Sequence, residues 1–273
     1  MKKIPAVLSF RRVRQSVAPA AFATVLLVAA STTCAANRVF LVNGNVLAFQ
    51  SIEWRGVSKE YRITTAQSVL PVALKDVDHL EVDRPADFDK AAKMVEAGQN
   101  AAAIPILKAI ADKYEMLVWD AQAAGLLGRA YIAQKDYSRA ADAIETVLKR
   151  SKPDTVPLAT LRAYWEALAG LKRNEDLRKA LDAAIGHGTR PTAAQAYLVR
   201  AGVEKAAGKT EEAAADYLKI VLLFDNLTEV QAEALAGAAE TLEALQDPRA
   251  QEMRTRLIKE FPSSPFAVKQ AAK

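Results

Sequence analysis

From about residue 85 to Lys273, apolar residues recur at helical spacing in pairs of stretches separated by short polar turns. A small residue follows each turn, at positions spaced by 37, 40, 33 and 37 residues. Small residues allow two helices to approach closely, and one helical hairpin cannot bury its apolar face alone. The pattern therefore predicts a mainly α fold of about five stacked helical hairpins over residues 85–273. The small residues are Ala103, Ala140, Ala180, Ala213 and Ala250.

Residues 37–84 show strand-like alternation of apolar and polar positions instead. Two apolar runs flank Asn43-Gly44, a pair typical of a two-residue hairpin turn in which both central residues have positive φ. Later alternating segments bring the expected total to five short strands, and Pro71 favours an edge strand because it cannot donate a hydrogen bond. We expect a small β-barrel or β-meander. It either caps the first helical hairpin or serves as a binding module.

Residues 1–36 have the pattern of a secretory signal peptide. Five basic residues and no acid accompany an apolar stretch from Ala18 to Ala30, which is shorter than the about 20 residues that span a bilayer. Small residues follow, so we expect cleavage after Ala35 or Ala36. An uncleaved signal anchor is the alternative.

Cys34 is the only cysteine of the chain, and two interpretations of it remain open. In the first it is removed with the signal, and the exported chain has no cysteine and no disulfide. In the second it is the lipid-modified N-terminus of a lipoprotein, although Ser31 and Thr33 replace the residues that such a signal prefers. We expect contact with a membrane only in the second case.

The net charge of +5 comes entirely from residues 1–36. The remaining residues carry 32 basic and 32 acidic side chains. A nucleic-acid-binding protein needs a basic surplus on its folded part. We therefore expect no nucleic-acid partner.

Residues 37–273 offer few groups for catalysis or metal binding. Their two histidines, His79 and His187, are far apart in sequence, and they contain no cysteine, no glycine-rich phosphate loop and no nucleophile elbow. We expect no cofactor, no metal and no catalytic residue. An enzyme acting on the cell wall is retained as an alternative.

Residues 124–153 resemble a tetratricopeptide repeat. The segment Leu127-Gly128-Arg129-Ala130-Tyr131 matches the Leu-Gly-x-x-Tyr pattern of that family, Ala140 matches the small residue of the second helix, and Pro153 ends the unit. The resemblance extends less regularly over residues 86–273. It implies a tetratricopeptide-like helical-hairpin solenoid behind the β segment, and a non-enzymatic scaffold or adaptor that binds a protein or peptide.

The ending from Phe261 to Ala267 resembles helix ends of exported tetratricopeptide proteins in Gram-negative bacteria. This resemblance implies a location in the periplasm or cell envelope. The alternative is a lipid-anchored factor for outer-membrane assembly or cell-wall coordination.

In this family the first helix of each repeat lines the partner-binding groove. The charged members of the implied set are all basic, which suits an extended acidic peptide held by charge and by stacking on Trp165. The competing interpretation is a charged helix face that is only solvated. The implied groove residues are Gln122, Arg129, Arg162, Trp165, Lys172, Gln195 and Lys205.

Overall fold

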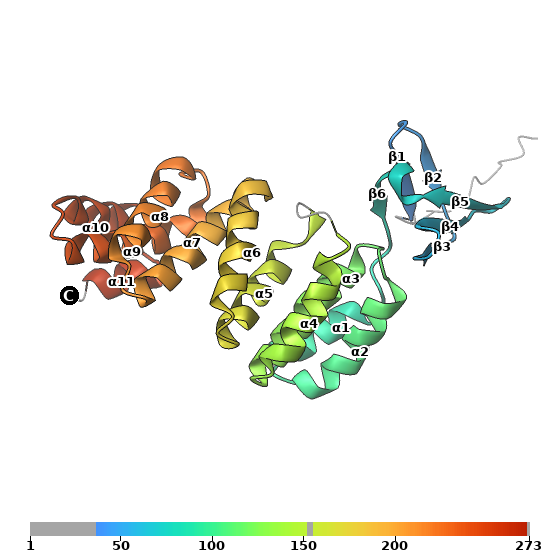
Figure 1. Cartoon of the computed structure of the whole chain (residues 1–273), viewed down its shortest axis with the longest axis horizontal. Coiled ribbons are helices and arrows are strands. Elements are labelled where there is room, and N and C mark those ends of the chain that lie inside the picture. Colours follow the sequence, from blue (N-terminus) through green and yellow to red (C-terminus); the bar gives the residue numbers. More distant parts are fainter. Residues whose placement is uncertain (1–36, 152–154, 272–273) are drawn as a thin grey trace, which may run out of the picture. The chain divides into compact units, whose positions relative to one another are not determined.

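The computed structural model describes residues 37–151 and 155–271, which belong to one compact unit, Ala36–Lys273. The expected signal peptide, its cleavage site and Cys34 lie outside the described residues, as does Pro153. Within these residues, six strands are followed by eleven α-helices (Figure 1). The prediction of a mainly α fold behind a small β segment is confirmed.

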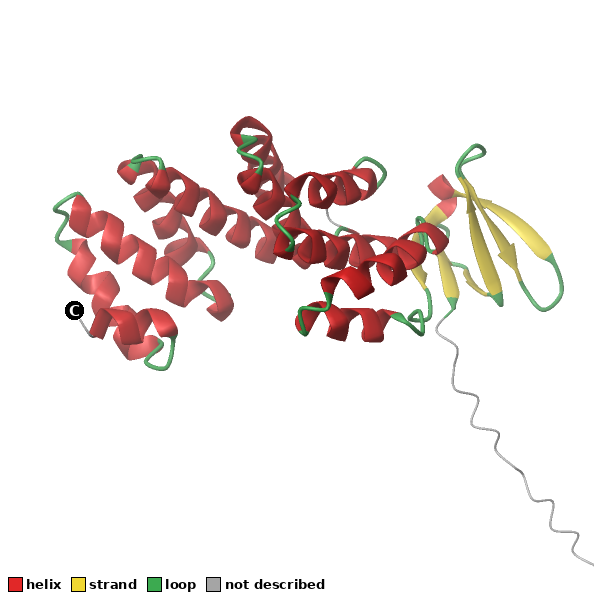
Figure 2. Ribbon diagram, turned by 90° about the horizontal axis from the view of Figure 1, so that it is seen from below, coloured by secondary structure: helices red, strands yellow, loops and turns green. Residues whose placement is uncertain are grey.

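The strands form two antiparallel sheets of three strands each, which are yellow in Figure 2. Both are open sheets, so the barrel alternative is wrong, and the described strands number six and not five. The 3-10 helix Leu74–Asp76 leads into the last strand. The first sheet has the order β2-β1-β6, with β1 at Arg38–Leu41, β2 at Val46–Ala48 and β6 at Val77–Glu81. The second has the order β3-β4-β5, with β3 at Ser51–Arg55, β4 at Glu60–Thr64 and β5 at Val69–Ala73.

Two local predictions in the β segment can be compared with the structure. Asn43 and Gly44 do connect the hairpin of β1 and β2, but only Gly44 has positive φ, at 85°. The turn is therefore not the expected type with two left-handed residues. Pro71 lies on β5, an edge strand, as its missing N–H group predicts.

Ten of the described helices form five consecutive hairpins, and α11 (Pro265–Ala271) follows them. We call the leading member of each hairpin the first helix and the other the second helix. The first helices are α1 (Phe88–Glu96), α3 (Trp119–Ala133), α5 (Leu158–Gly170), α7 (Arg190–Ala206) and α9 (Thr228–Ala244). The second helices are α2 (Asn100–Lys113), α4 (Tyr137–Leu148), α6 (Asn174–His187), α8 (Thr210–Leu223) and α10 (Arg249–Glu260).

The repeat is marked most regularly by the turn between the two helices of each hairpin. Each turn contains one residue with positive φ, and these residues are spaced by 37, 37, 36 and 38 positions. A left-handed residue ends a helix and reverses the chain without further length. Only two of the five are glycine. The spacing of these turn residues therefore cannot be recognised from glycine positions in the sequence. The five residues are Gly98, Lys135, Lys172, Gly208 and Gln246.

The alanine landmarks lie five residues after the left-handed turn residue in the first, second and fourth hairpins and four residues after it in the fifth, but the third hairpin differs. Ala140 lies five residues after its left-handed turn residue and is fully buried. The equivalent position in the third hairpin is Leu177, which is 2% exposed, whereas Ala180 is only partly buried. The prediction that Ala180 is the small residue at the helix contact of the third hairpin is therefore wrong. In this hairpin α5 and α6 also make the sparsest contact of the five.

Glycines allow α3 and α5 to pack against each other at very short range. The Thr160 hydroxyl donates a hydrogen bond to the Ala121 carbonyl at 2.9 Å. A Cβ atom on Gly125 would lie 2.3 Å from Thr160 Oγ1 and 3.1 Å from Thr160 Cα. A Cβ atom on Gly128 would lie 3.3 Å from the Cβ atom of Ala163 on α5 and 2.7 Å from a side-chain carbon of Ile144 on α4. The first helices of the second and third hairpins thus lie side by side.

The apolar core of the β segment includes a residue from the helical part. Leu117, in the loop between α2 and α3, is 4% exposed and belongs to the same buried cluster as Val39 and Ile63. The Tyr61 hydroxyl donates a hydrogen bond to the Met116 carbonyl at 3.0 Å. The β segment therefore packs against the loop that joins the first hairpin to the second.

A buried carboxylate holds this loop in place. Asp120, which is 3% exposed, accepts hydrogen bonds from the Met116 amide and from the Arg150 guanidinium of the segment after α4, both at 2.9 Å. Met116 and Val118 have positive φ, which is unfavourable for residues other than glycine. The ion pair thus stabilises a strained loop at the junction with the β segment.

We predict opposite effects for two glycine-to-alanine substitutions. Gly125→Ala places a methyl group against the backbone of Thr160, and we expect a loss of about 1–3 kcal/mol in the free energy of unfolding. Gly202→Ala on α7 meets no atom within 4 Å, and we expect a gain of up to about 1 kcal/mol from helix propensity. Urea unfolding measures both. Equal effects of the two substitutions would show that α3 and α5 are not in close contact.

Candidate partner-binding surface

The accessible side chains of α3 lie mainly on one face. They are Gln122, Leu126, Arg129 and Ala133, spaced by four, three and four residues. This spacing places them in one row along the helix. Most other α3 side chains are buried against α2, α4 and α5.

The corresponding rows on α5, α7 and α9 also have spacings of three or four residues, which keep their members on one helix face. We call the four rows together the first-helix surface. It consists of Gln122, Leu126, Arg129 and Ala133 on α3, Ala159, Arg162, Glu166 and Ala169 on α5, Gln195, Val199, Gly202 and Lys205 on α7, and Glu229, Glu233, Ala236 and Glu240 on α9.

Three of the residues chosen from the sequence lie on this surface with accessible side chains and no partner within the described residues. Gln122 is partly exposed, and Arg129 and Arg162 are exposed. Arg129 and Arg162 lie on two helices that contact each other. The structure thus brings two free guanidinium groups to neighbouring rows.

Trp165 is not available to a partner. It is 1% exposed and packs in the cluster that contains Leu168 and Leu181. The expectation of stacking on Trp165 is therefore wrong, and the surface position is taken by the next residue, Glu166. A shift of one residue in helical register turns a surface position into a core position.

Two other chosen residues are placed differently from the expectation. Gln195 does lie on the α7 row, but it is 9% exposed and is nearly covered. Lys172 lies beyond the end of α5, where it is the exposed left-handed residue of the turn to α6. Its position therefore has a structural role in the hairpin.

The α9 row makes the surface mixed in charge and not uniformly basic. Lys205 forms an ion pair with Glu240 of α9, with 2.5 Å between Nζ and Oε2. Glu229 and Glu233 of the same row are exposed. These acids are absent from the set predicted from the sequence, because no α9 position was assigned to the surface. Their spacing of four and then seven residues is the signal that would have found them.

Glu233 of α9 lies near enough to Arg162 of α5 for the two charges to interact. Burial raises the pKa of the Glu233 carboxyl, and the Arg162 guanidinium partly opposes this rise. The Glu233 side chain is nevertheless exposed, so its burial is partial. No hydrogen bond or ion pair joins the two side chains within the described residues.

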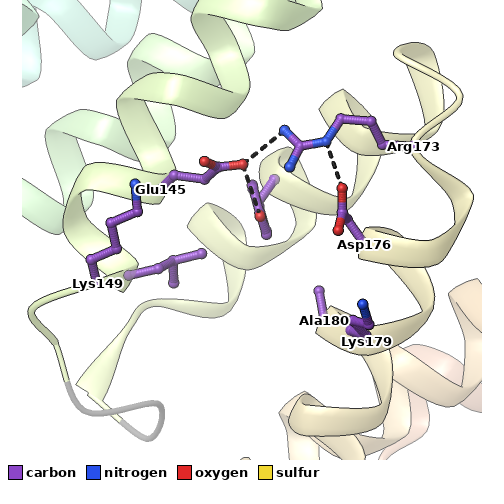
Figure 3. A pocket seen from close by; sticks show the side chains of 8 residues that line it. Glu145, Lys149, Arg173, Asp176, Lys179 and Ala180 are labelled. Atoms are coloured by element: carbon purple, nitrogen blue, oxygen red, sulfur yellow. Dashed lines mark hydrogen bonds and ion pairs between the residues drawn. The ribbon is translucent and has the colours of Figure 1, made fainter.

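A separate hollow of about 450 Å³ lies between α4, α5 and α6 (Figure 3). Arg173 bridges Glu145 at 2.9 Å and Asp176 at 2.8 Å, and the Tyr164 hydroxyl bonds to Glu145 at 3.2 Å. Burial, followed by the charge of Glu145, raises the pKa of Tyr164 to about 12. The phenol thus keeps its proton at neutral pH. This ion-pair network joins the second hairpin to the third.

Metal-ligating side chains do not gather within residues 37–151 and 155–271, where no group of three or more His, Cys, Asp or Glu is placed to hold a metal ion. No helix in this described part is long and apolar enough to cross a membrane.

Comparison with known proteins identifies the type of repeat. Residues 94–163 match the tetratricopeptide repeat family model. The solved structure of a putative kinesin light chain from Podospora anserina with nearly identical tetratricopeptide-like repeats has a TM-score of 0.50 and 16% identity, covering 68% of this chain and 94% of that one. YrrB, a tetratricopeptide protein described as having an unusual peptide-binding site, has a TM-score of 0.46 and 16% identity, covering 70% of this chain and 93% of that one. The search of curated proteins found no match. The helical part therefore has a tetratricopeptide-like fold.

The substitution Glu233→Gln should stabilise the protein at neutral pH. Because the pKa is raised above its ordinary value of 4.5, the folded state binds the proton more tightly than the unfolded chain. The charged carboxylate therefore lowers stability at neutral pH, and this loss disappears as the pH falls through the raised pKa to below 4.5. Thermal unfolding should show a higher Tm for the variant at neutral pH and no difference in acid. Glu229→Gln controls for the loss of one charge, and a Glu233→Gln effect independent of pH would contradict the prediction.

Proposed function

We propose that this chain is a non-enzymatic scaffold that binds a protein or peptide through the first-helix surface. One observation carries the proposal. Within the described residues, every arginine except Arg62, Arg129 and Arg162 forms a hydrogen bond or ion pair with another side chain or the backbone. Two of these three lie on neighbouring first helices. A free guanidinium on an otherwise paired surface is ready to bind a carboxylate.

The tetratricopeptide-like fold supports this proposal. Stacked helical hairpins present an extended surface, and repeat proteins use such surfaces to bind other macromolecules. The described residues offer an enzyme less support, because Glu145, Arg173 and Asp176 in the hollow between α4, α5 and α6 are already paired with one another. A wall-active enzyme is the alternative that this network does not favour.

We further propose that the scaffold works in the envelope of a Gram-negative bacterium. The signal-like residues 1–36, the lack of cysteine after Cys34 and the ending from Phe261 to Ala267 support this location. The alternative is a chain anchored by a lipid on Cys34, with a role in outer-membrane assembly or cell-wall coordination.

Reversing the charge of the predicted groove cations tests the binding surface. We expect the double change of Arg129 and Arg162 to Glu to abolish the recovery of partners that the unchanged protein captures by cross-linking in envelope fractions. The physical reason is that acidic groups on the partner would then meet two carboxylates in place of two guanidinium groups. Lys172 is left unchanged because it is the left-handed residue of the turn after α5. Quantitative mass spectrometry of the captured proteins measures the loss.

The matched control changes Arg62 and Lys259 to Glu, two exposed cations outside the first-helix surface. The control has the same net charge as the test variant, so a nonspecific charge effect would reduce capture equally in both. Circular dichroism checks that both variants fold. Undiminished capture by the folded groove variant would refute the assignment of the surface.

The mature N-terminus distinguishes soluble export from lipid anchoring. We expect mass spectrometry of the protein from its natural host to find a free N-terminus at Ala36 or Asn37, because cleavage after a small residue releases the signal. A diacylated Cys34 would support the lipid-anchored alternative. An intact Met1 would contradict both forms of processing.

A further inference from the structure

Side chains at the junctions between hairpins occupy positions that recur from one hairpin to the next. Arg200 lies eight residues before Gly208, the left-handed turn residue of the fourth hairpin. Its guanidinium donates hydrogen bonds to the Asp182 carboxylate of α6 at 2.7 Å and to the Asp216 carboxylate of α8 at 2.6 Å. Asp216 lies eight residues after Gly208 and is 2% exposed. The space between α6, α7 and α8 is therefore filled by an arginine and the acids that it binds.

The preceding junction has a hollow at the same positions. Tyr164 lies eight residues before the left-handed Lys172 and thus corresponds to Arg200. Ala180 lies eight residues after Lys172 and thus corresponds to Asp216. Tyr164 and Ala180 both line the hollow of about 450 Å³ between α4, α5 and α6 (Figure 3). The hollow therefore lies where this hairpin has a methyl group and the next hairpin has a buried carboxylate.

Two lysines line this hollow from different helices and have ammonium groups available to a ligand (Figure 3). Lys149 follows the last residue of α4, and its exposed side chain has no hydrogen-bond or ion-pair partner within the described residues. Lys179 on α6 has only Glu175 at 3.6 Å, and ion pairs as exposed as this one contribute little. The other charged lining residues are one arginine and two acids, which are paired with one another. With three basic and two acidic side chains, the lining has a net charge of +1.

The hollow also offers apolar contact beside these charges. The partly buried Leu148, Ala180 and Tyr164 belong to its lining. Its volume lies within the range of about 300–1,000 Å³ that is typical of small-ligand sites, so side chains of a short segment can enter it. A ligand that complements the lining therefore combines a carboxylate with a neighbouring apolar side chain.

We propose that this hollow is a second binding site, which accepts an aspartate or glutamate side chain of a partner protein together with an adjacent apolar side chain. The carboxylate lies beside Ala180, where the next junction has Asp216, and pairs with Lys149 and Lys179. The apolar side chain packs on Leu148. This site goes beyond the proposed function, because most of its lining comes from the second helices and none of it belongs to the first-helix surface.

Two synthetic libraries of octapeptides test the ligand chemistry. Both carry Leu, Phe, Val and Ala at the apolar positions, and both are capped at each end so that only side chains can be charged. One library has Asp and Glu at its polar positions, and the other has Asn and Gln. The target is the immobilised compact unit that begins at residue 36. We expect enrichment from the acidic library alone, because only a carboxylate pairs with both lysines.

Variants of the lining then locate the site. We expect Lys149→Glu and Lys179→Glu each to weaken an enriched peptide by about tenfold or more, measured by fluorescence polarisation. Ala180→Asp should weaken it as strongly, because the new carboxylate occupies the space of the ligand's carboxylate. Lys259→Glu on α10 is the matched control, since it makes the same charge change on an exposed lysine outside the hollow. Circular dichroism checks that each variant folds.

The outcomes separate this site from the first-helix surface. Peptides that are weakened by the Arg129 and Arg162 double variant, and by none of the hollow variants, would overturn this inference while supporting the proposed function. Equal weakening by Lys259→Glu, or no preference for the acidic library, would overturn this inference alone. Binding of an amide peptide only when its C-terminus is left uncapped would assign the hollow to a terminal carboxylate and overturn the side-chain ligand.

Discussion

The close approach of α3 and α5 determines which side chains this protein can present. Gly125 and Gly128 remove the side chains that would separate the two helices, and the bond from Thr160 to the Ala121 carbonyl fixes their contact. With one flank of α3 occupied by α5 and others by the second helices, a single row remains open on it. The position of Arg129 relative to Arg162 is therefore a consequence of two missing Cβ atoms, and the binding surface depends on backbone packing.

The pairing of the charged side chains is more informative in this protein than their net charge. Buried acids such as Asp120 and Asp216 are bonded to arginines from other helices, as in the contact of Arg200 with Asp216. Buried ion pairs of this kind fix the alignment of neighbouring elements, because a misplaced partner would leave a charge without compensation. Against this background an arginine without a partner is informative, whereas the neutral net charge of the folded part reveals little about where a ligand binds.

The fold class could be predicted from the sequence because helical periodicity and small residues at helix contacts are local signals. The predictions that were wrong concern burial and register, which depend on packing against neighbouring helices. Trp165 and Glu166 are adjacent, and only the packing of α5 against its neighbours decides which one is buried. Ala180 resembled a landmark, but the left-handed Lys172 sets the register and places Leu177 there instead. The effect of Arg162 on the pKa of Glu233 depends on how the hairpins stack, because the two residues are 71 positions apart in sequence. In the β segment, alternation predicted the strands, but not whether the two sheets close.

Leu117 has a consequence for how the chain divides into parts. In sequence the β segment ends near residue 84, yet its apolar core is completed by a residue that follows the first hairpin. The first hairpin is thus an insertion between two portions of one hydrophobic cluster. A fragment cut at the apparent boundary would expose Val39 and Ile63, and a helical fragment beginning there would expose Leu117. The order of the elements along the chain and the units that share one apolar core therefore do not coincide.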